Sequence, residues 1–296
     1  MGFLHPTGNI NPKATTRVNN AANLLFTHRS LHNAMTKRQY RHVPRKPTLS
    51  PSKLTTYLAC PAKYYWTYLD PRGKWYLRAR SHYSFGLTLH RVLERFHDSG
   101  DSGVTTTEEA LAALEESWID AGFSSAQEMQ EAMGEGKAII EAHVARARVA
   151  DVGAKTLLVE KSFSLDLGPF CLIGRIDRVD EHPDGSLEII DYKSQRTSVT
   201  PEDVQTDLAL CCYQLYIRKE YPDRPVRATL LAVRSGEKAS HSLSEAEAEE
   251  LTRDLVFLGE HVLHREYEFL VPTRKPLCEH CDFLSLCRKH PEFDAE

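Results

Sequence analysis

Two aspartates and a lysine stand in two apolar segments where a β-sheet would ordinarily bury aliphatic side chains. The segments lie in GRIDRVDEHPDGSLEIIDYKS, residues 174–194, and the charged side chains are Asp177, Asp191 and Lys193. Carboxylates suit Mg²⁺ or Mn²⁺, and a nearby ammonium group can orient a water or offset negative charge in a phosphoryl transition state. These residue types therefore indicate metal-assisted phosphoryl chemistry.

The turn between the segments decides whether the two aspartates can meet. Residues 183–185, Pro-Asp-Gly, suit a three-residue hairpin loop with glycine in the left-handed conformation. Closing that loop on His182 opposite Ser186 predicts that Asp177 faces Asp191 across the hairpin. Facing carboxylates repel, so one interpretation is a cation bound between them. The other is a pair of rim carboxylates that form ion pairs with neighbouring basic side chains.

The periodicity of apolar residues predicts the elements that position this hairpin. Helices are expected from 51, with Ser50 as N-cap, and at 82–100, 108–122, 126–150, 201–221 and 245–268, and strands at 155–167, 170–181, 187–194 and within 226–235. The order is helices, β-meander, helix, strand and helix. It predicts one α/β domain with a mixed sheet flanked by helices.

The hairpin and the helix before it resemble the RecB-like branch of the PD-(D/E)XK nuclease superfamily. The resemblance rests on D-x₁₃-D-Y-K preceded by GRIDRVD, and on FGLTLHRVLE upstream, and it extends over about 48–290. It implies a restriction-endonuclease-like core and a Mg²⁺- or Mn²⁺-dependent deoxyribonuclease. By this resemblance His90, Asp177, Asp191 and the backbone carbonyl of Tyr192 would bind the metal, and Lys193 would serve the attacking water.

The same resemblance suggests further site residues. Glu160 is similar to an acid often found on the strand before the hairpin. Tyr213 matches the tyrosine of a Gln-x-x-x-Tyr motif that contacts substrate, but Ala209 stands where the motif has glutamine. Gln214 is a candidate to compensate, although its offset differs.

Aromatic and basic residues are interleaved in KYYWTYLDPRGKWYLRARSHY, residues 63–83. Aromatic rings stack on bases and cations meet phosphates, a combination that suits single-stranded nucleic acid. Arg78 and Arg80 are the predicted DNA contacts. The sequence contains no G-x-x-x-x-G-K-[ST] phosphate loop, so a helicase, or a recombination or CRISPR-related protein, would be a separate partner.

Four of the seven cysteines have the spacing of metal ligands. Cys278, Cys281 and Cys287 form C-x₂-C-x₅-C, and Cys60 precedes a proline far upstream. Zinc is the default ion for a four-cysteine site. The arrangement is similar to the iron–sulfur staple of AddB-type and CRISPR-associated RecB-like nucleases and of eukaryotic exonuclease V. That resemblance implies a 4Fe–4S cluster joining the N- and C-terminal segments of the nuclease domain.

Charge is distributed unevenly along the chain. Ten lysines and arginines but no acidic residue precede Asp70. Residues 1–46 are predicted to be a basic, disordered tail, with a nucleic-acid arm or a transit peptide as alternatives, and 47–296 to be one nuclease domain. No apolar run approaches the roughly 20 residues that span a membrane. We therefore expect no membrane partner and a cytoplasmic location, or a mitochondrial one if the tail is a transit peptide.

Three functional hypotheses follow from these patterns. The first is a metal-dependent DNA exonuclease in repair, recombination or phage- or CRISPR-related processing. The second is a DNA-binding or assembly subunit that keeps the nuclease fold but has weak activity. The third is a zinc-stabilised protein with no nuclease role. The set of His90, Asp177, Asp191 and Lys193 favours the first hypothesis.

Overall fold

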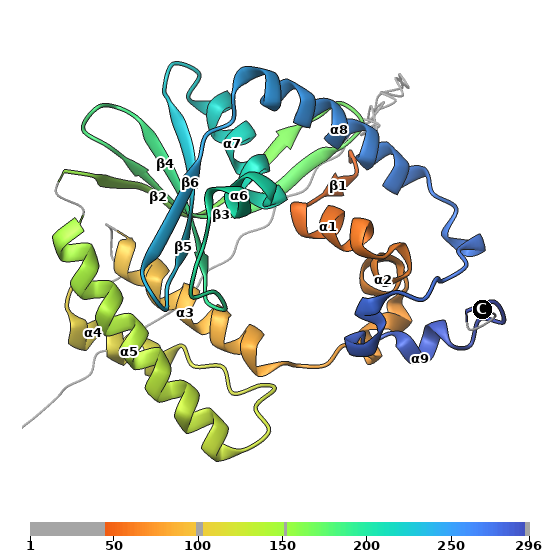
Figure 1. Cartoon of the computed structure of the whole chain (residues 1–296), viewed down its shortest axis with the longest axis horizontal. Coiled ribbons are helices and arrows are strands. Elements are labelled where there is room, and N and C mark those ends of the chain that lie inside the picture. The colour runs from red at the N-terminus through yellow and green to blue at the C-terminus, as the bar shows by residue number, and fades with distance from the viewer. Residues whose placement is uncertain (1–44, 99–102, 151–152, 294–296) are drawn as a thin grey trace, which may run out of the picture. The chain divides into compact units, whose positions relative to one another are not determined.

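A six-stranded mixed sheet with helices on both faces forms the centre of the protein (Figure 1). This architecture confirms the predicted α/β class with a mixed sheet flanked by helices. The computed structural model describes residues 45–98, 103–150 and 153–293. The predicted tail, apart from Arg45 and Lys46, lies outside the described residues and stays a prediction. The helix predicted to stop at Gly100 ends earlier, at His97.

The sheet combines parallel and antiparallel pairs. Its strands are β1 (Thr48–Leu49), β2 (Lys155–Asp166), β3 (Cys171–Glu181), β4 (Leu187–Lys193), β5 (Val226–Ala232) and β6 (Glu237–His241). The order is β1-β3-β4-β5-β6, with β2 paired to β3, and the β1–β3 and β4–β5 pairs are parallel. Sequence patterns missed β1, which has two residues, and β6, whose EKASH sequence lacks apolar alternation.

The longer helices lie close to their predicted positions, whereas two four-residue helices, α2 and α9, were not predicted. They are α1 (Pro51–Ala59), α2 (Pro61–Tyr64), α3 (Ser81–His97), α4 (Thr107–Glu116), α5 (Ala126–Ala150), α6 (Pro201–Thr206), α7 (Leu208–Glu220), α8 (Glu245–His264) and α9 (Leu284–Cys287). Ser50 caps α1 as predicted, since its side chain accepts a hydrogen bond from the Lys53 N–H. None of the helices in the described ranges is long and apolar enough to cross a membrane.

The helix predicted across 201–221 is interrupted at Asp207. This residue has an extended backbone, with φ −75° and ψ 103°, so it ends α6 and begins α7. Its side chain accepts hydrogen bonds from the N–H groups of Ala209 and Leu210. An aspartate N-cap stabilises a new helix start, and this local preference outweighs the apolar periodicity that predicted one continuous helix.

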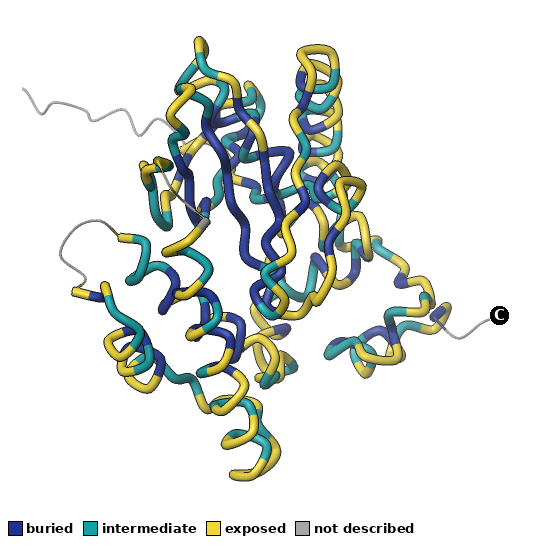
Figure 2. Tube along the Cα trace, turned by 60° about the vertical axis from the view of Figure 1, so that its left-hand side comes forward, coloured by how far each residue is buried: buried dark blue, intermediate teal, exposed yellow. Residues whose placement is uncertain are grey.

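Each face of the sheet has its own hydrophobic core, and buried strands run between helices whose outer sides are exposed (Figure 2). On one face Leu89 of α3 and Ile140 of α5 pack with Ile190 of β4. On the other face Leu210 of α7 and Leu255 of α8 pack with the opposite side of the strands. Helix α3 is therefore fixed against the sheet by a core of its own.

The β3–β4 hairpin has the predicted turn. The His182 N–H donates to the Ser186 carbonyl at 3.0 Å, and Gly185 has φ +84°. Arg178 pairs with Ile190, which is the predicted register. One expectation is wrong, however: the ladder ends at that pair, so Asp177 is not paired with Asp191. Instead the Asp177 side chain accepts a hydrogen bond from the Tyr192 N–H at 3.0 Å.

The strand alternation also changes at this point. Ile176 and Val179 lie three residues apart but pack into the same core, whereas strict alternation would place them on opposite faces. On the neighbouring strand Glu160 has φ +47°, the one positive φ of a non-glycine residue in the described ranges. Backbone strain of this kind is concentrated at functional sites.

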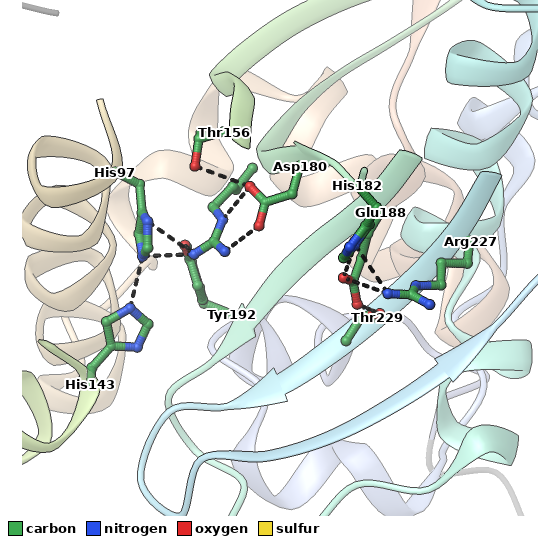
Figure 3. Close-up of polar contacts among 10 residues, drawn as sticks. His97, His143, Thr156, Asp180, His182, Glu188, Tyr192, Arg227 and Thr229 are labelled. Carbon is green, nitrogen blue, oxygen red and sulfur yellow. Dashed lines mark hydrogen bonds and ion pairs between the residues drawn. The ribbon is translucent and has the colours of Figure 1, made fainter. Parts of the chain in front are cut away.

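A buried polar network lies beside the ladder end (Figure 3). Arg178 forms an ion pair with Asp180, and both side chains are almost fully buried. The Arg178 guanidinium also contacts the His97 ring and lies 3.5 Å from the Tyr192 hydroxyl. The Nε2 atoms of His97 and His143 are 2.8 Å apart. A buried ion pair is tolerated when further hydrogen bonds satisfy it, as these do.

We expect Gly185→Ala to lower the free energy of unfolding by about 1 kcal/mol, because the left-handed conformation is unfavourable for alanine. Gly134→Ala, in the exposed middle of α5, is the matched control. A Cβ atom at either glycine would meet no atom within 4 Å, so the two sites differ in φ rather than in space. Alanine at 134 should stabilise the helix by roughly 0.5–1 kcal/mol. Equal effects in chemical denaturation would contradict the turn assignment.

Stability should fall as pH decreases below about 6.5, partly because of His143. Burial, helped by the charges of Arg178, Arg146 and Lys238, lowers the pKa of His143 to about 3. The unfolded chain therefore binds a proton in this range that the folded protein excludes, which removes up to about 1.4 kcal/mol per pH unit. We expect His143→Gln to flatten the dependence of Tm on pH between 4 and 6.5, relative to the exposed His264→Gln. An unchanged slope would contradict this assignment.

Candidate metal-dependent active site

Three side chains from three elements converge at the irregular part of the sheet. His90 of α3, Glu160 of β2 and Asp177 of β3 each place one potential ligand atom within 4.8 Å of the other two. His90 Nδ1 lies 3.4 Å from Asp177 Oδ1, and its Nε2 lies 3.1 Å from the carbonyl oxygen of Tyr192. The structure thus brings together His90, Asp177 and the Tyr192 carbonyl, all proposed as ligands from the sequence.

Glu160 is the third member of this trio, although the sequence suggested it only through the family resemblance. Its Oε2 lies 2.6 Å from Arg175 Nε. Burial, followed by the charge of Asp177, raises the pKa of Glu160 to about 7. A divalent cation would offset the repulsion between these carboxylates and favour the charged form of Glu160.

Lys193 lies between two carboxylates at the end of β4. Its Nζ is 2.7 Å from Asp191 Oδ2 and 3.1 Å from Asp207 Oδ2. Burial alone would lower the pKa of Lys193, but the charges of Asp191 and Asp207 outweigh it and raise the pKa. These two carboxylates favour the ammonium form of Lys193, which can orient a water or offset negative charge.

Asp191 is not a member of this trio, and one of its oxygens forms the ion pair with Lys193. Burial, followed by the charge of Asp177, raises its pKa to about 6. Asp191 thus lies close enough to Asp177 to feel its charge and stays a proposed ligand. Asp207 was not predicted as a site residue from the sequence; the available signal was its strong N-cap preference just before an apolar stretch.

The donor set fits the predicted cation. It offers several carboxylates, a backbone carbonyl and one imidazole, and such oxygen-rich sites suit Mg²⁺ or Mn²⁺ better than softer ions. The carboxylates around His90 favour its protonated form. Burial lowers the pKa of His90, but Asp177, Asp191 and Glu160 together outweigh burial and raise it. Metal binding would require the neutral imidazole and would compete with that proton.

The predicted substrate residues on α7 have different surroundings. Burial, followed by the charges of Asp191 and Asp177, raises the pKa of Tyr213, so this residue lies within electrostatic range of the site. Gln214 is fully buried, and its Oε1 accepts a hydrogen bond from the Leu243 N–H at 3.0 Å. The predicted substrate contact of Gln214 is therefore wrong, because the side chain is enclosed in the core.

The two arginines that were predicted to contact DNA have different surroundings. Arg80 Nη2 donates to Asp282 Oδ1 at 2.8 Å and to the His280 carbonyl at 2.9 Å. Arg80 thus joins the start of α3 to the C-terminal segment, and its predicted role as a free phosphate contact is not supported. The side chain of Arg78 is exposed at the same place, so it keeps its predicted role as a proposal.

The four predicted cysteine ligands come together at a separate place. Cys60, Cys278 and Cys287 are buried in one small apolar cluster with Ala62 and Phe293. Burial, followed by the proximity of Cys281, Cys60 and Cys278, raises the pKa of the Cys287 thiol to about 11.

Backbone groups point at these sulfurs. The Lys63 N–H donates to Cys60 Sγ and the Lys275 N–H to Cys278 Sγ, both at 3.4 Å. N–H donors stabilise thiolates, and a bound metal would convert the raised-pKa thiols to thiolates. The site therefore fits a four-thiolate metal group.

Comparisons with known proteins bear on the whole domain. A sequence model of the PD-(D/E)XK nuclease superfamily matches residues 48–288. No curated protein matches the chain. Solved structures that are similar to this chain at low sequence identity include the following three.

The first is EndoMS in complex with double-stranded DNA, with 24% identity and a TM-score of 0.23 over 42% of this chain and 41% of that one. The second is SSO0001, with 15% identity and a TM-score of 0.31 over 69% and 84% of the two chains. The third is a putative exonuclease from Eubacterium rectale, with 12% identity and a TM-score of 0.34 over 68% and 90%. This chain thus spans less than half the length of the EndoMS chain.

The family match covers β1 through α9 and includes the hairpin, the upstream helix and most of the cysteine cluster. Its extent, well over half of the 296 residues, shows that this chain belongs to the PD-(D/E)XK nuclease superfamily.

Proposed function

We propose that this protein is a Mg²⁺- or Mn²⁺-dependent DNA exonuclease of the RecB-like type. The observation that carries this proposal is the convergence of His90, Glu160 and Asp177, with their ligand atoms within 4.8 Å of one another. A divalent cation supplies an activated water and stabilises negative charge on phosphate. His90, Asp177, Asp191 and the Tyr192 carbonyl would hold the ion, with Glu160 as a further acid.

The side chains around the proposed metal have separate tasks. Asp177 uses Oδ2 to accept the Tyr192 N–H, while its Oδ1 lies on the side of His90. One carboxylate oxygen thus stays available for a ligand role while the other fixes the strand. The Lys193 ammonium would orient the attacking water and offset the charge that develops on the phosphate.

A groove near the start of α3 supports single-stranded DNA as the substrate. Its volume is about 670 Å³, and its lining includes Tyr68, Arg78, His82 and Tyr83. Tyr83 is 65% exposed, and Tyr68 is 38% exposed. Exposed aromatic rings beside a cation provide stacking surfaces for unpaired bases. His82 and Tyr83 of this groove belong to α3, the helix that also carries His90.

The direct test is digestion of DNA in three forms. Purified protein is incubated with end-labelled linear single strands, linear duplex and circular single strands, in Mg²⁺, Mn²⁺ or EDTA. We expect degradation of linear single strands with either metal, little loss of circles and none in EDTA. Equal cleavage of circles would indicate an endonuclease. Binding without any cleavage would favour the alternative of a DNA-binding or assembly subunit.

We further propose that the four cysteines hold a 4Fe–4S cluster rather than zinc. This proposal is supported by the burial of Cys60, Cys278 and Cys287 in one cluster. It also rests on the arrangement of one upstream cysteine and a C-terminal triplet, which is similar to the iron–sulfur staple of AddB-type nucleases. Zinc bound by the same four thiolates is the alternative.

We expect Lys193→Met to slow cleavage by about 10²- to 10³-fold, because it removes one preorganised charge from the transition state. DNA affinity and Mn²⁺ affinity should stay close to those of the parent, since Lys193 is not assigned to the metal. Single-turnover experiments measure the cleavage rate, and calorimetric titration measures the Mn²⁺ affinity. Asp177→Asn is the contrasting variant and should lose both cleavage and Mn²⁺ binding. Cleavage by Lys193→Met at the parental rate with saturating metal would refute the active site.

Serine at Cys60 or Cys281 should remove iron and the brown colour from anaerobically purified protein and lower its Tm, because the cluster joins distant segments. Cys171→Ser is the control, since Cys171 lies on β3 outside the cysteine cluster. Iron, sulfide and zinc analyses make the measurement. One zinc per chain with no iron in the parent protein would rule out the cluster.

A further inference from the structure

Asp207 uses both of its carboxylate oxygens, and they connect two different parts of the protein. Oδ1 accepts hydrogen bonds from the N–H groups of Ala209 at 3.0 Å and Leu210 at 3.2 Å, which begins α7. Oδ2 lies 3.1 Å from Lys193 Nζ at the end of β4. The residue therefore ties a lysine side chain to the start of a helix.

The helix end that holds Asp207 is itself firmly anchored. Leu210, in the first turn of α7, is fully buried in the core on this face of the sheet. Lys193, in contrast, is a long side chain that is 28% exposed. A lysine loses much rotamer entropy when its ammonium is held in one place, so its position depends on the groups that bind it.

The two partners of Lys193 would respond differently to a cation. Asp191 is a proposed metal ligand, so an ion would share the carboxylate that now lies 2.7 Å from Lys193 Nζ. Asp207 is not assigned to the metal, and its other oxygen is held by the first N–H groups of α7. Its attraction for the lysine would therefore be retained when the site is loaded.

We propose that Asp207 is a positioning residue for the reaction, which it affects by holding the Lys193 ammonium at a fixed place relative to Asp191. This inference rests on the proposed nuclease function. The competing explanation is that Asp207 is a helix cap and nothing more. The two explanations make different predictions for asparagine, because asparagine caps helices about as well as aspartate but carries no charge.

We expect Asp207→Asn to lower kcat by about 10- to 100-fold, the loss typical of one hydrogen bond between charged groups, with KM for DNA and Mn²⁺ affinity close to the parental values. The matched control is Asp203→Asn. Asp203 lies on α6 one turn before Asp207, but its Oδ1 is paired with Arg196 at 2.6 Å rather than with Lys193. The control should change kcat by no more than about twofold. A parental kcat for Asp207→Asn would overturn the proposal.

The double variant tests whether Asp207 acts through Lys193. Because Lys193→Met already removes the ammonium, adding Asp207→Asn should slow cleavage no further. If the second substitution slows the Lys193→Met protein as much as it slows the parent, Asp207 acts independently and the proposal is wrong.

A second readout does not depend on nuclease activity. The Tm changes of Asp207→Asn and Lys193→Met should not add in the double variant, since both remove the same contact. Additive changes would show that Asp207 does not hold Lys193, whatever the protein does to DNA. A parent that shows this coupling but cleaves no DNA would instead refute the proposed function while leaving the contact established.

Discussion

The hydrogen bond from the Tyr192 N–H to the Asp177 carboxylate joins β3 and β4 beyond the point where their backbone ladder ends. A side-chain oxygen here takes the place of a backbone carbonyl, so the buried N–H keeps a partner although the strands no longer pair regularly. The exchange leaves the Tyr192 carbonyl free to face His90 at 3.1 Å. The interruption of the sheet thus creates the oxygen-rich site, and Asp177 stabilises both.

Helix α3 joins this site to the buried polar network. His90 and His97 are two turns apart on the helix: His90 contacts Asp177 and the Tyr192 carbonyl, whereas His97 contacts the Arg178 guanidinium. The network therefore holds the same helix and the same strand that supply the proposed metal ligands. Burying an ion pair costs desolvation energy, and a requirement for fixed geometry beside a reactive site gives a physical reason to retain it.

Local chemistry allowed the sequence to predict the hairpin, because Pro-Asp-Gly limits the turn and the turn limits the register. Three decisive features depend on long-range contacts instead. The ladder stops before Asp177, Glu160 adopts a positive φ, and Asp207 contacts Lys193 of another element. The helix break at Asp207 does have a local signal, its N-cap preference, but the apolar pattern continues across it. Periodicity describes regular elements, so it could not show where these irregularities lie, and Asp207 could not be linked to Lys193 without the fold.

Helix α3 connects the proposed cluster to the proposed metal site. Arg80 is the N-cap residue of α3, and its guanidinium is paired with Asp282, which follows Cys281. His90 lies ten residues further along the same helix, whose core contacts with Ile190 and Tyr192 hold it against the sheet. A metal group that ordered the cysteine segment would therefore fix the first turn of α3. Because a packed helix transmits a displacement along its axis, it would also limit the positions that His90 can take.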